Sequence, residues 1–386
     1  MSLFASAPRR ALVAAASGAV ILSMAACSTA SDSGGSSSAS NGGDLSASEQ
    51  KCMDSVDKYF ADRGADLPDS LPEALAPLTK TPDQGLTVTH LFTGDTTSQE
   101  VKGGWEQAAS ALGWDLNAVA TDLTPEDVNE KALAAVKDSD VVVVDGLPPA
   151  ALQEPIKAAK AAGVLFAIAS TPDAPESVPG FGATPHGGAW FNNLGELAGY
   201  ALLRSTKCQA HVASFGIPID ASNNVISGLE EVVKQECPDC TTTKTDIQFA
   251  DLGSPAATTA VVSKLQSDPS INFVFCFFGQ VATGVTAALK GAGLDAQIGG
   301  TLPATPNLDE LQKGDNAFWV GAPLPVVGWL EADTVARALD AGQPTPGDVG
   351  PVSIYTSENV GDPGSTVPVA PDGYQDAFKK LWLVDN

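Results

Sequence analysis

The residues that most often carry enzymatic or metal chemistry are few in this chain and poorly spaced for it. The three histidines, His90, His186 and His211, are far apart and lack the short spacing of metal ligands. The sequence has no Gly-x-Ser-x-Gly nucleophile elbow and no phosphate-binding glycine loop with a lysine. No motif marks a pair of catalytic carboxylates. We therefore expect a binding protein without a metal or cofactor, rather than an enzyme.

Cys27 ends a segment that is typical of an export signal. Two arginines at positions 9 and 10 precede an apolar stretch, residues 11–22, that is shorter than the roughly 20 residues of a membrane-spanning helix. Residues 22–27, Leu-Ser-Met-Ala-Ala-Cys, resemble a bacterial lipobox, although Met24 replaces the usual aliphatic residue. We predict a signal peptide over residues 1–26 and a lipid on Cys27 that anchors the protein to the outer face of the bacterial cytoplasmic membrane. The alternative is ordinary cleavage near Ala26, which leaves Cys27 a plain thiol.

Five further cysteines make disulfides possible in an exported chain. Cys208 and Cys240 each precede a predicted strand, and neighbouring parallel strands begin close together. A Cys208–Cys240 bridge is therefore expected, with Cys208–Cys237 as the alternative. The spacing of Cys237 and Cys240 also suits zinc or redox chemistry, but it lacks a second ligand pair. An odd number leaves at least one free thiol, and we expect this to be Cys276, an inert core residue.

Length and charge narrow the class of protein. A chain of 386 residues is long enough for two or three domains with hydrophobic cores. It has 21 Lys and Arg against 46 Asp and Glu, a net charge of −25, so no nucleic-acid partner is expected. Residues 27–47 are dominated by Ser, Gly and Ala, which predicts a flexible tether behind the lipid. Residues 48–85 predict a short helix and then a Pro-rich linker.

From residue 86 onward, predicted strands and helices alternate. Residues 86–92 form the first predicted strand, and residues 97–100, Thr-Ser-Gln-Glu, form a capping box that opens a helix. Residues 141–144 are continuously apolar, as in a strand buried on both faces. A second alternating set follows a Pro- and Gly-rich connection at residues 171–189. The pattern predicts an α/β protein with two doubly wound parallel-sheet lobes and a ligand cleft beyond the carboxyl ends of the strands.

The stretch from about residue 86 to residue 358 resembles the type I periplasmic binding proteins, the ribose-binding-like receptors of ABC importers. Five segments in order carry the resemblance: AAKAAGV at 158–164, NLGELAGY at 193–200, GVTAALKGAG at 284–293, NLDELQKG at 307–314 and GWLEADTVARAL at 328–339. The resemblance implies a multi-crossing hinge, with lobe one at 86–170 and 323–350. Lobe two is then 171–322 and 351–386, the latter including a C-terminal tail. It also implies capture of a small-molecule ligand by hinge closure and delivery to ABC permease subunits, by a protein expected to be a monomer.

The family's pocket loops, transferred to this sequence, identify candidate ligand contacts. The polar candidates are Thr93, Asp95, Thr97, Asp145, Ser170, Asp220, Asn223 and Gln280, and the apolar candidates are Trp190, Phe278, Leu302 and Leu324. Asp145 is also suited to capping the next helix, Asp95 to satisfying the backbone of its own loop, and Trp190 to packing beneath its lobe. The loops lack several of the polar side chains that sugar receptors of this family use. Because each unpaired sugar hydroxyl costs about 1–3 kcal/mol, we expect a ligand with substantial apolar surface and one to three polar groups.

The predicted function is that of a lipid-anchored, extracytoplasmic substrate-binding protein of an ABC importer. A sensory receptor that passes its ligand-bound state to a membrane signalling protein would use the same closure, and remains the main alternative. A surface lipoprotein whose cleft no longer binds a ligand is a third possibility.

Overall fold

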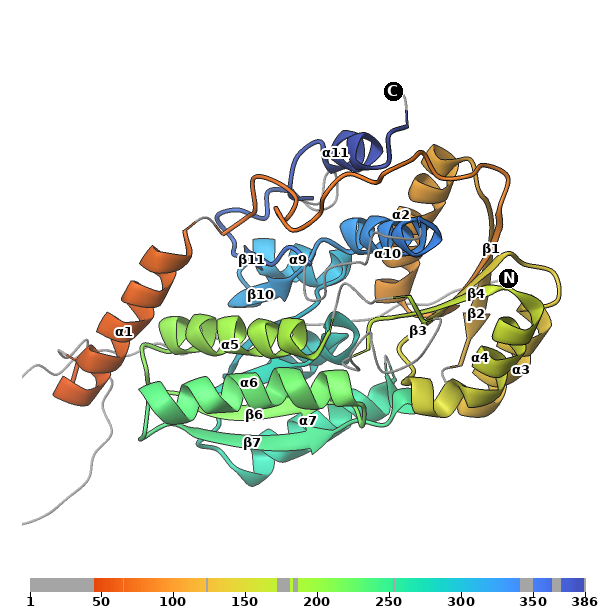
Figure 1. Cartoon of the computed structure of the whole chain (residues 1–386). Helices are drawn as coiled ribbons and strands as arrows, with labels where there is room; N and C mark the ends of the chain where they lie inside the picture. The colour runs from red at the N-terminus through yellow and green to blue at the C-terminus, as the bar shows by residue number, and fades with distance from the viewer. Residues whose placement is uncertain are drawn as a thin grey trace, which may run out of the picture. The chain divides into compact units, whose positions relative to one another are not determined.

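The computed structural model describes residues 45–64, 66–122, 124–171, 187–252, 254–340, 350–362 and 369–384, together with the backbone of 181–182 (Figure 1). The predicted signal peptide, Cys27 and nearly all of the tether lie outside these residues. Within the part of the chain that is described, none of the helices combines the length and the apolar character needed to cross a membrane.

Lobe one is built on a five-stranded parallel sheet of order β2-β1-β3-β4-β5. The strands alternate with helices along the chain, as the sequence predicts. The elements are β1 (Thr87–Thr93), α2 (Thr96–Leu112), β2 (Asp115–Thr121), α3 (Pro125–Ala135), β3 (Val141–Asp145), the 3-10 helix η1 (Pro149–Leu152), α4 (Gln153–Ala162), β4 (Leu165–Ala169) and β5 (Phe181–Gly182).

Strand β3 lies in the middle of this sheet and is buried on both faces, as its apolar run predicts. Val142 and Val144 belong to the core beneath α3 and α4. Val141 and Val143 point the other way, into the larger core that includes Trp105 of α2. Successive side chains of a strand face opposite sides, so this strand requires helices on both faces of its sheet.

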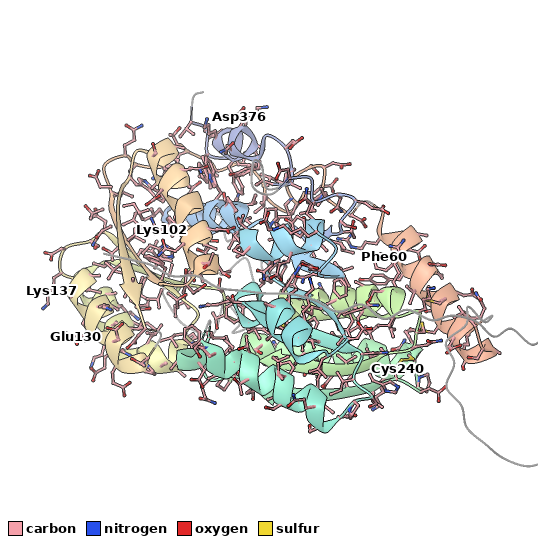
Figure 2. The ribbon with its side chains drawn as sticks, turned by 180° about the vertical axis from the view of Figure 1, so that it is seen from behind. Phe60, Lys102, Glu130, Lys137, Cys240 and Asp376 are labelled. Carbon is pink, nitrogen blue, oxygen red and sulfur yellow. A yellow bond between two sulfur atoms is a disulfide. The ribbon has the colours of Figure 1, made fainter. Side chains whose placement is uncertain are left out.

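Lobe two contains a six-stranded sheet of order β11-β10-β9-β8-β6-β7, parallel except for β11. Helices α5 and α6 cover one face, and α7 and α8 cover the other (Figures 1 and 2). The elements are α5 (Gly188–Ser205), β6 (His211–Gly216), α6 (Asp220–Glu236), β7 (Thr241–Asp246), η3 (Phe249–Asp251), α7 (Pro255–Ser267), β8 (Phe273–Cys276), η4 (Gly279–Ala282), α8 (Val285–Ala292), β9 (Gln297–Thr301), α9 (Thr305–Gln312), β10 (Phe318–Gly321) and β11 (Ser353–Tyr355). The expected two-lobed α/β architecture is confirmed.

Helix α10 (Leu324–Leu339) returns from lobe two and lies against α2. The two backbones touch: a Cβ at Gly104 would stand 2.1 Å from the Pro325 carbonyl oxygen, and one at Gly328 would stand 2.3 Å from the Val101 oxygen. Glycine at both positions therefore permits the close approach of the helices.

The boundaries between the lobes differ from the expectation in two places. β5 pairs with β4, so residues 181–182 belong to the sheet of lobe one, and the first crossing comes after them rather than near Ser170. The C-terminal tail was assigned to lobe two, and β11 does join that sheet. Helix α11 (Tyr374–Leu381), however, packs on α10 of lobe one, where the ring of Trp382 stacks on Trp329 at 5.1 Å. Neither feature has a strong sequence signal, because β5 has only two residues and α11 follows a Pro-rich stretch.

The N-terminal segment is more than a linker. Helix α1 (Ala47–Arg63) packs on α5 of lobe two, where Tyr59 stacks on Tyr200 at 3.8 Å and Arg204 lies over Phe60 (labelled in Figure 2). The following stretch reaches lobe one, where the backbone N–H and hydroxyl of Thr79 donate to Asp340 at the end of α10. Residues 45–85 therefore contact both lobes.

The cysteine pairing corrects the prediction. Cys52 of α1 is bonded to Cys208, and Cys237 is bonded to Cys240, so neither Cys208–Cys240 nor Cys208–Cys237 forms. Cys208 does lie close to Cys237 and Cys240, as the prediction requires. The sulfurs of Cys237 and Cys240 are 3.2 and 3.5 Å from the Cys208 carbonyl oxygen. The missing partner was Cys52, whose helix was not expected to dock there. Cys276 is free and buried as predicted, and burial raises the pKa of its thiol.

A matched pair of substitutions tests the contact between α2 and α10. Gly104→Ala should lower the free energy of unfolding by about 1–3 kcal/mol, because the added methyl group meets backbone. Gly103→Ala adds the same methyl where no atom lies within 4 Å, and should stabilise by up to about 1 kcal/mol through helix propensity. Urea denaturation monitored by tryptophan fluorescence measures both. Equal effects of the two substitutions would contradict the contact.

Peptide mapping without reduction tests the disulfides. Proteolysis of the thiol-blocked protein should release a linked pair of peptides containing Cys52 and Cys208, and an internal bridge between Cys237 and Cys240. Cys276 should react with a maleimide only after unfolding, because its thiol is buried. A peptide pair joining Cys208 to Cys240 would restore the original prediction.

Candidate functional site

A cavity of about 140 Å³ lies between the carboxyl ends of the two sheets. Lobe one lines it from the ends of β1, β3 and β4 and from the starts of α2 and α10. Lobe two lines it from the start of α5 and the loops that follow β6, β7, β8 and β9. The lining residues are Thr93, Asp95, Thr97, Ser98, Val101, Asp145, Gly146, Ser170, Leu324 and Val327 on one side, and Trp190, Phe191, Ile217, Ile219, Ala221, Phe249, Phe277, Phe278 and Leu302 on the other.

Most of the residues predicted as ligand contacts line this cavity, and three do not. Those brought together are Thr93, Asp95, Thr97, Asp145, Ser170, Trp190, Phe278, Leu302 and Leu324. Asp220 and Asn223 lie outside it and are exposed, in the first turn of α6. Asn223 instead accepts a hydrogen bond from Lys244. Gln280 also lies outside, on η4, where its Oε1 is buried without a partner among the described residues.

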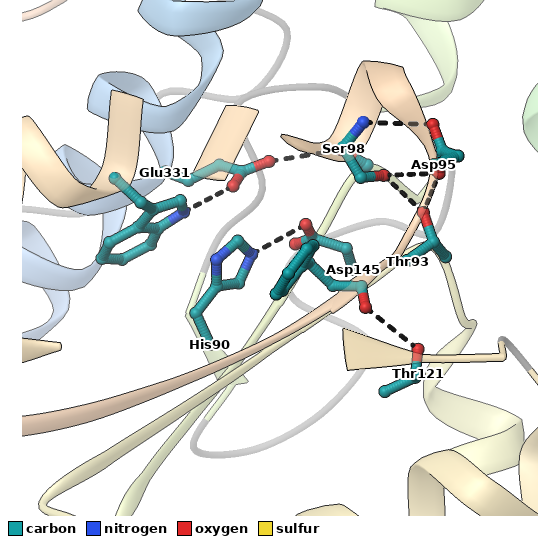
Figure 3. A network of polar contacts seen from close by, with 10 residues as sticks. His90, Thr93, Asp95, Ser98, Thr121, Asp145 and Glu331 are labelled. Atoms are coloured by element: carbon teal, nitrogen blue, oxygen red, sulfur yellow. Dashed lines mark hydrogen bonds and ion pairs between the residues drawn. The ribbon is translucent and has the colours of Figure 1, made fainter. Parts of the chain in front are cut away.

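Asp95 is the N-cap of α2, which corrects the capping box predicted at Thr97. Its Oδ1 accepts the Ser98 N–H at 3.1 Å, and its Oδ2 accepts the Ser98 hydroxyl at 2.9 Å and the Thr93 hydroxyl (Figure 3). Three donors from its own loop therefore satisfy this carboxylate, as one of the two interpretations of Asp95 expected. Glu100 therefore takes no part in a capping box. Its carboxylate accepts hydrogen bonds from the N–H and the hydroxyl of Thr305 at the start of α9, each at 2.9 Å.

Asp145 is the last residue of β3, and its carboxylate contacts a buried histidine. His90 Nε2 lies 2.8 Å from Asp145 Oδ2 (Figure 3). The side chain of His90 is fully buried, whereas that of Asp145 is 12% exposed. Asp145 Oδ1 and His90 Nδ1 have no hydrogen-bond partner among the described residues. The carboxylate therefore has one oxygen fixed by the protein and one left without a donor.

Glu331 of α10 lies next to this pair and is fully buried. Trp105 Nε1 donates to its Oε2 at 2.7 Å, and the Ser170 hydroxyl donates to its Oε1 at 3.3 Å. Burial raises the pKa of Glu331 well above its ordinary value, and the nearby carboxylate of Asp145 raises it further. No prediction included Glu331 or His90. The signal that was missed is a lone acid inside the apolar run at residues 326–332.

The ligand atoms of His90, Asp145 and Glu331 lie within 4.8 Å of one another, a set that could hold a metal ion. The contacts present satisfy much of the set internally: His90 pairs with Asp145, and Trp105 and Ser170 donate to Glu331. We therefore treat the group as a polar cluster of which Asp145 lines the cavity, and assign no metal to it.

Two residues on opposite walls adopt a backbone conformation that is uncommon for non-glycine residues. Ser170 has φ 56°, and Leu302 has φ 49°. Both lie directly after a strand and both line the cavity. Such conformations persist where surrounding structure holds them, and they cluster at binding sites. Their location supports the cavity as the functional site.

Known proteins were compared with the chain. A sequence model described as a periplasmic binding protein domain matches residues 88–344. Curated protein sequences gave no significant match. Among solved structures, a glucose-galactose binding protein from Geobacillus stearothermophilus is similar with a TM-score of 0.61 at 20% identity, over 72% of this chain and 100% of that one.

Two further structures show the same fold. A solute-binding protein from Actinobacillus succinogenes 130z with bound D-allose has a TM-score of 0.60 at 16% identity, over 71% of this chain and 98% of that one. The 5-methylthioribose transporter solute-binding protein from Thermotoga lettingae TMO, in complex with 5-methylthioribose, has a TM-score of 0.62 at 15% identity, over 76% and 97% of the two chains. At these identities, the similarity concerns the fold.

A charge-removing substitution tests the environment of Glu331. Because folding raises its pKa, this carboxyl group stabilises the fold below its ordinary pKa of 4.5, and that stabilisation is lost as pH rises through the folded value. Glu331→Gln keeps the shape of the protonated group. The stability of the variant relative to wild type should therefore increase from pH 4.5 to pH 8, by about 1.4 kcal/mol for each unit of pKa shift.

Urea denaturation at the two pH values measures the effect. Glu106→Gln is the control, because the side chain of Glu106 is 55% exposed on α2. A stability difference between Glu331→Gln and wild type that is the same at both pH values would show that folding does not shift the pKa of Glu331.

Proposed function

The chain belongs to the periplasmic binding protein domain family, and on that premise we propose that it captures a small molecule between its lobes and delivers it to an ABC importer. The observation that carries the proposal is the cavity at the carboxyl ends of both sheets, lined by side chains from both lobes. A ligand that touches both walls favours the closed arrangement of the lobes. The similar structures are binding proteins, which at family level agrees with the expectation that the chain is not an enzyme.

A direct contact between the lobes accompanies the cavity. Glu100 of α2 belongs to lobe one, and Thr305 begins α9 of lobe two. The Glu100 carboxylate accepts both the N–H and the hydroxyl of Thr305, at a helix N-terminus where negative charge is stabilised. This contact would reinforce the closed state once a ligand has brought the lobes together.

The family name implies an extracytoplasmic location. The lipobox-like residues 22–27 support a lipid anchor at Cys27. An acidic body gains nothing from anionic lipids, so we propose that acyl chains hold the protein near its permease.

The ligand that we propose is small and partly apolar. The similar structures named above include proteins in complex with D-allose and 5-methylthioribose. All the described residues on the lobe-two wall of this cavity have aromatic or aliphatic side chains. Several hydroxyls of a hexose would face that wall without partners, each at a cost of about 1–3 kcal/mol. A ligand with an apolar portion and a few polar groups avoids this cost.

A cavity-filling variant tests capture. Compounds that remain bound to the full-length chain in detergent can be identified by native mass spectrometry, and each can then be added back in thermal-shift titrations. At 100 times its dissociation constant, a ligand should stabilise the protein by about 2.7 kcal/mol. Ala221→Phe fills the cavity and should abolish the shift, whereas Ala256→Phe on the exposed face of α7 should leave it unchanged.

Uptake in cells separates import from signalling. Deletion of the protein should abolish uptake of the identified compound, and the Ala256→Phe variant should restore it. If the compound binds but its uptake persists after deletion, the importer role is wrong and the receptor alternative is favoured.

A further inference from the structure

The two walls of the cavity differ in chemistry. Among the described residues, every side-chain oxygen that lines it belongs to lobe one, and these come from Thr93, Asp95, Thr97, Ser98, Asp145 and Ser170. The lobe-two wall presents rings and aliphatic groups, with the rings of Trp190, Phe191, Phe249, Phe277 and Phe278. A ligand that fits both walls has a polar end at lobe one and an apolar body at lobe two.

The described residues that line the cavity offer many hydrogen-bond acceptors and few donors. They include two carboxylates, but no lysine, arginine, histidine, asparagine or glutamine. The hydroxyls of Thr93 and Ser98 donate to Asp95, and that of Ser170 donates to Glu331. The hydroxyl of Thr97 is buried without a partner among the described residues. A ligand would therefore meet acceptors that need donors.

Asp145 is the acceptor that most clearly lacks a donor. Its Oδ2 is paired with His90, but its Oδ1 is buried and has no partner among the described residues. The side chain lines the cavity and is only 12% exposed. A buried carboxylate oxygen without a donor is costly, and its field is strong where apolar walls exclude water. A positively charged donor in the cavity would be attracted to this carboxylate.

We propose that the ligand is an organic ammonium ion, which places its N–H groups on the carboxylate of Asp145 and its apolar body against the aromatic wall of lobe two. An ammonium group carries three donors and no acceptor, so it matches a lining in which acceptors outnumber donors. Aromatic faces also attract cations. A neutral sugar, whose oxygens accept as well as donate, would find few donors here. The inference rests on the proposed function, since it names the ligand class of the same cavity.

The test compares probes that differ only in the ammonium group. Benzylamine is paired with benzyl alcohol, glucosamine with glucose, and putrescine with 1,4-butanediol, each titrated into the full-length chain in detergent by calorimetry at pH 7. We expect at least one amine to bind about 10- to 100-fold more tightly than its neutral partner, as hydrogen bonds to charged groups allow.

Asp145→Asn should reduce this preference to less than about threefold, while the neutral partner keeps its affinity within about twofold. The amide oxygen can still accept from His90, so the loss of charge is separated from the loss of the His90 contact. Asp220→Asn removes an equal charge at an exposed position outside the cavity and should leave the preference intact.

Other outcomes overturn the proposal in distinguishable ways. Neutral probes that bind as tightly as amines, or a preference that survives in Asp145→Asn, would refute ammonium recognition and leave small-molecule capture standing. A failure of every amine to bind at millimolar concentration would also refute it. If the neutral probes fail as well and no compound co-purifies with the chain, the proposed capture function falls with it.

Discussion

The contact between α2 and α10 is the constraint on which the site depends. Two glycines, Gly104 and Gly328, let the helices meet backbone to backbone. This contact holds α10 in lobe one, although α10 follows a strand of lobe two in the chain. The consequences follow from helix geometry. Leu324 and Val327 reach the cavity from the first turn of α10, Glu331 lies one turn further on beneath it, and Trp329 faces α11. A wider spacing between the helices would withdraw Glu331 from Trp105 and leave the buried indole N–H without its acceptor.

Asp145 lines the cavity as part of a polar cluster within lobe one. His90 orients one oxygen of Asp145, and Glu331 lies close to both residues. Burial and the nearby carboxylate of Asp145 raise the pKa of Glu331, which favours the neutral form of this buried acid. Lobe two adds shape and apolar surface. Lobe one thus supplies the polar groups that orient a ligand, and lobe two supplies the apolar surface that encloses it.

Much of the fold could be predicted because its signals are local. The Thr124-Pro125 start of α3 and the glycines that follow α2 and α4 in left-handed conformations mark helix ends directly. The local signals failed where two residues compete for one role. Asp95 and Thr97 can both cap a helix, and only the path of the backbone decides in favour of Asp95.

Part of the site could be predicted because the topology of the sheet brings the ends of its strands together. Asp145 and Ser170 follow parallel strands, and the ends of such strands converge in every open α/β sheet. Glu331 lies 186 positions from Asp145 in the chain and meets it only through packing of α10, which periodicity does not reveal. The same limit applies to Cys52, since no sequence pattern shows that α1 docks beside Cys208.

The cysteine chemistry has a practical consequence. Within the described residues every cysteine is either in a disulfide or buried, as Cys276 is, so the native fold presents no reactive thiol to a labelling reagent. Gly94 and Asp220 are exposed residues near the carboxyl ends of β1 and β6, one on each lobe. Cysteines introduced there could carry a pair of fluorophores without removal of any native cysteine from the body. The scaffold is in this respect ready for use as an optical sensor of the compound it binds.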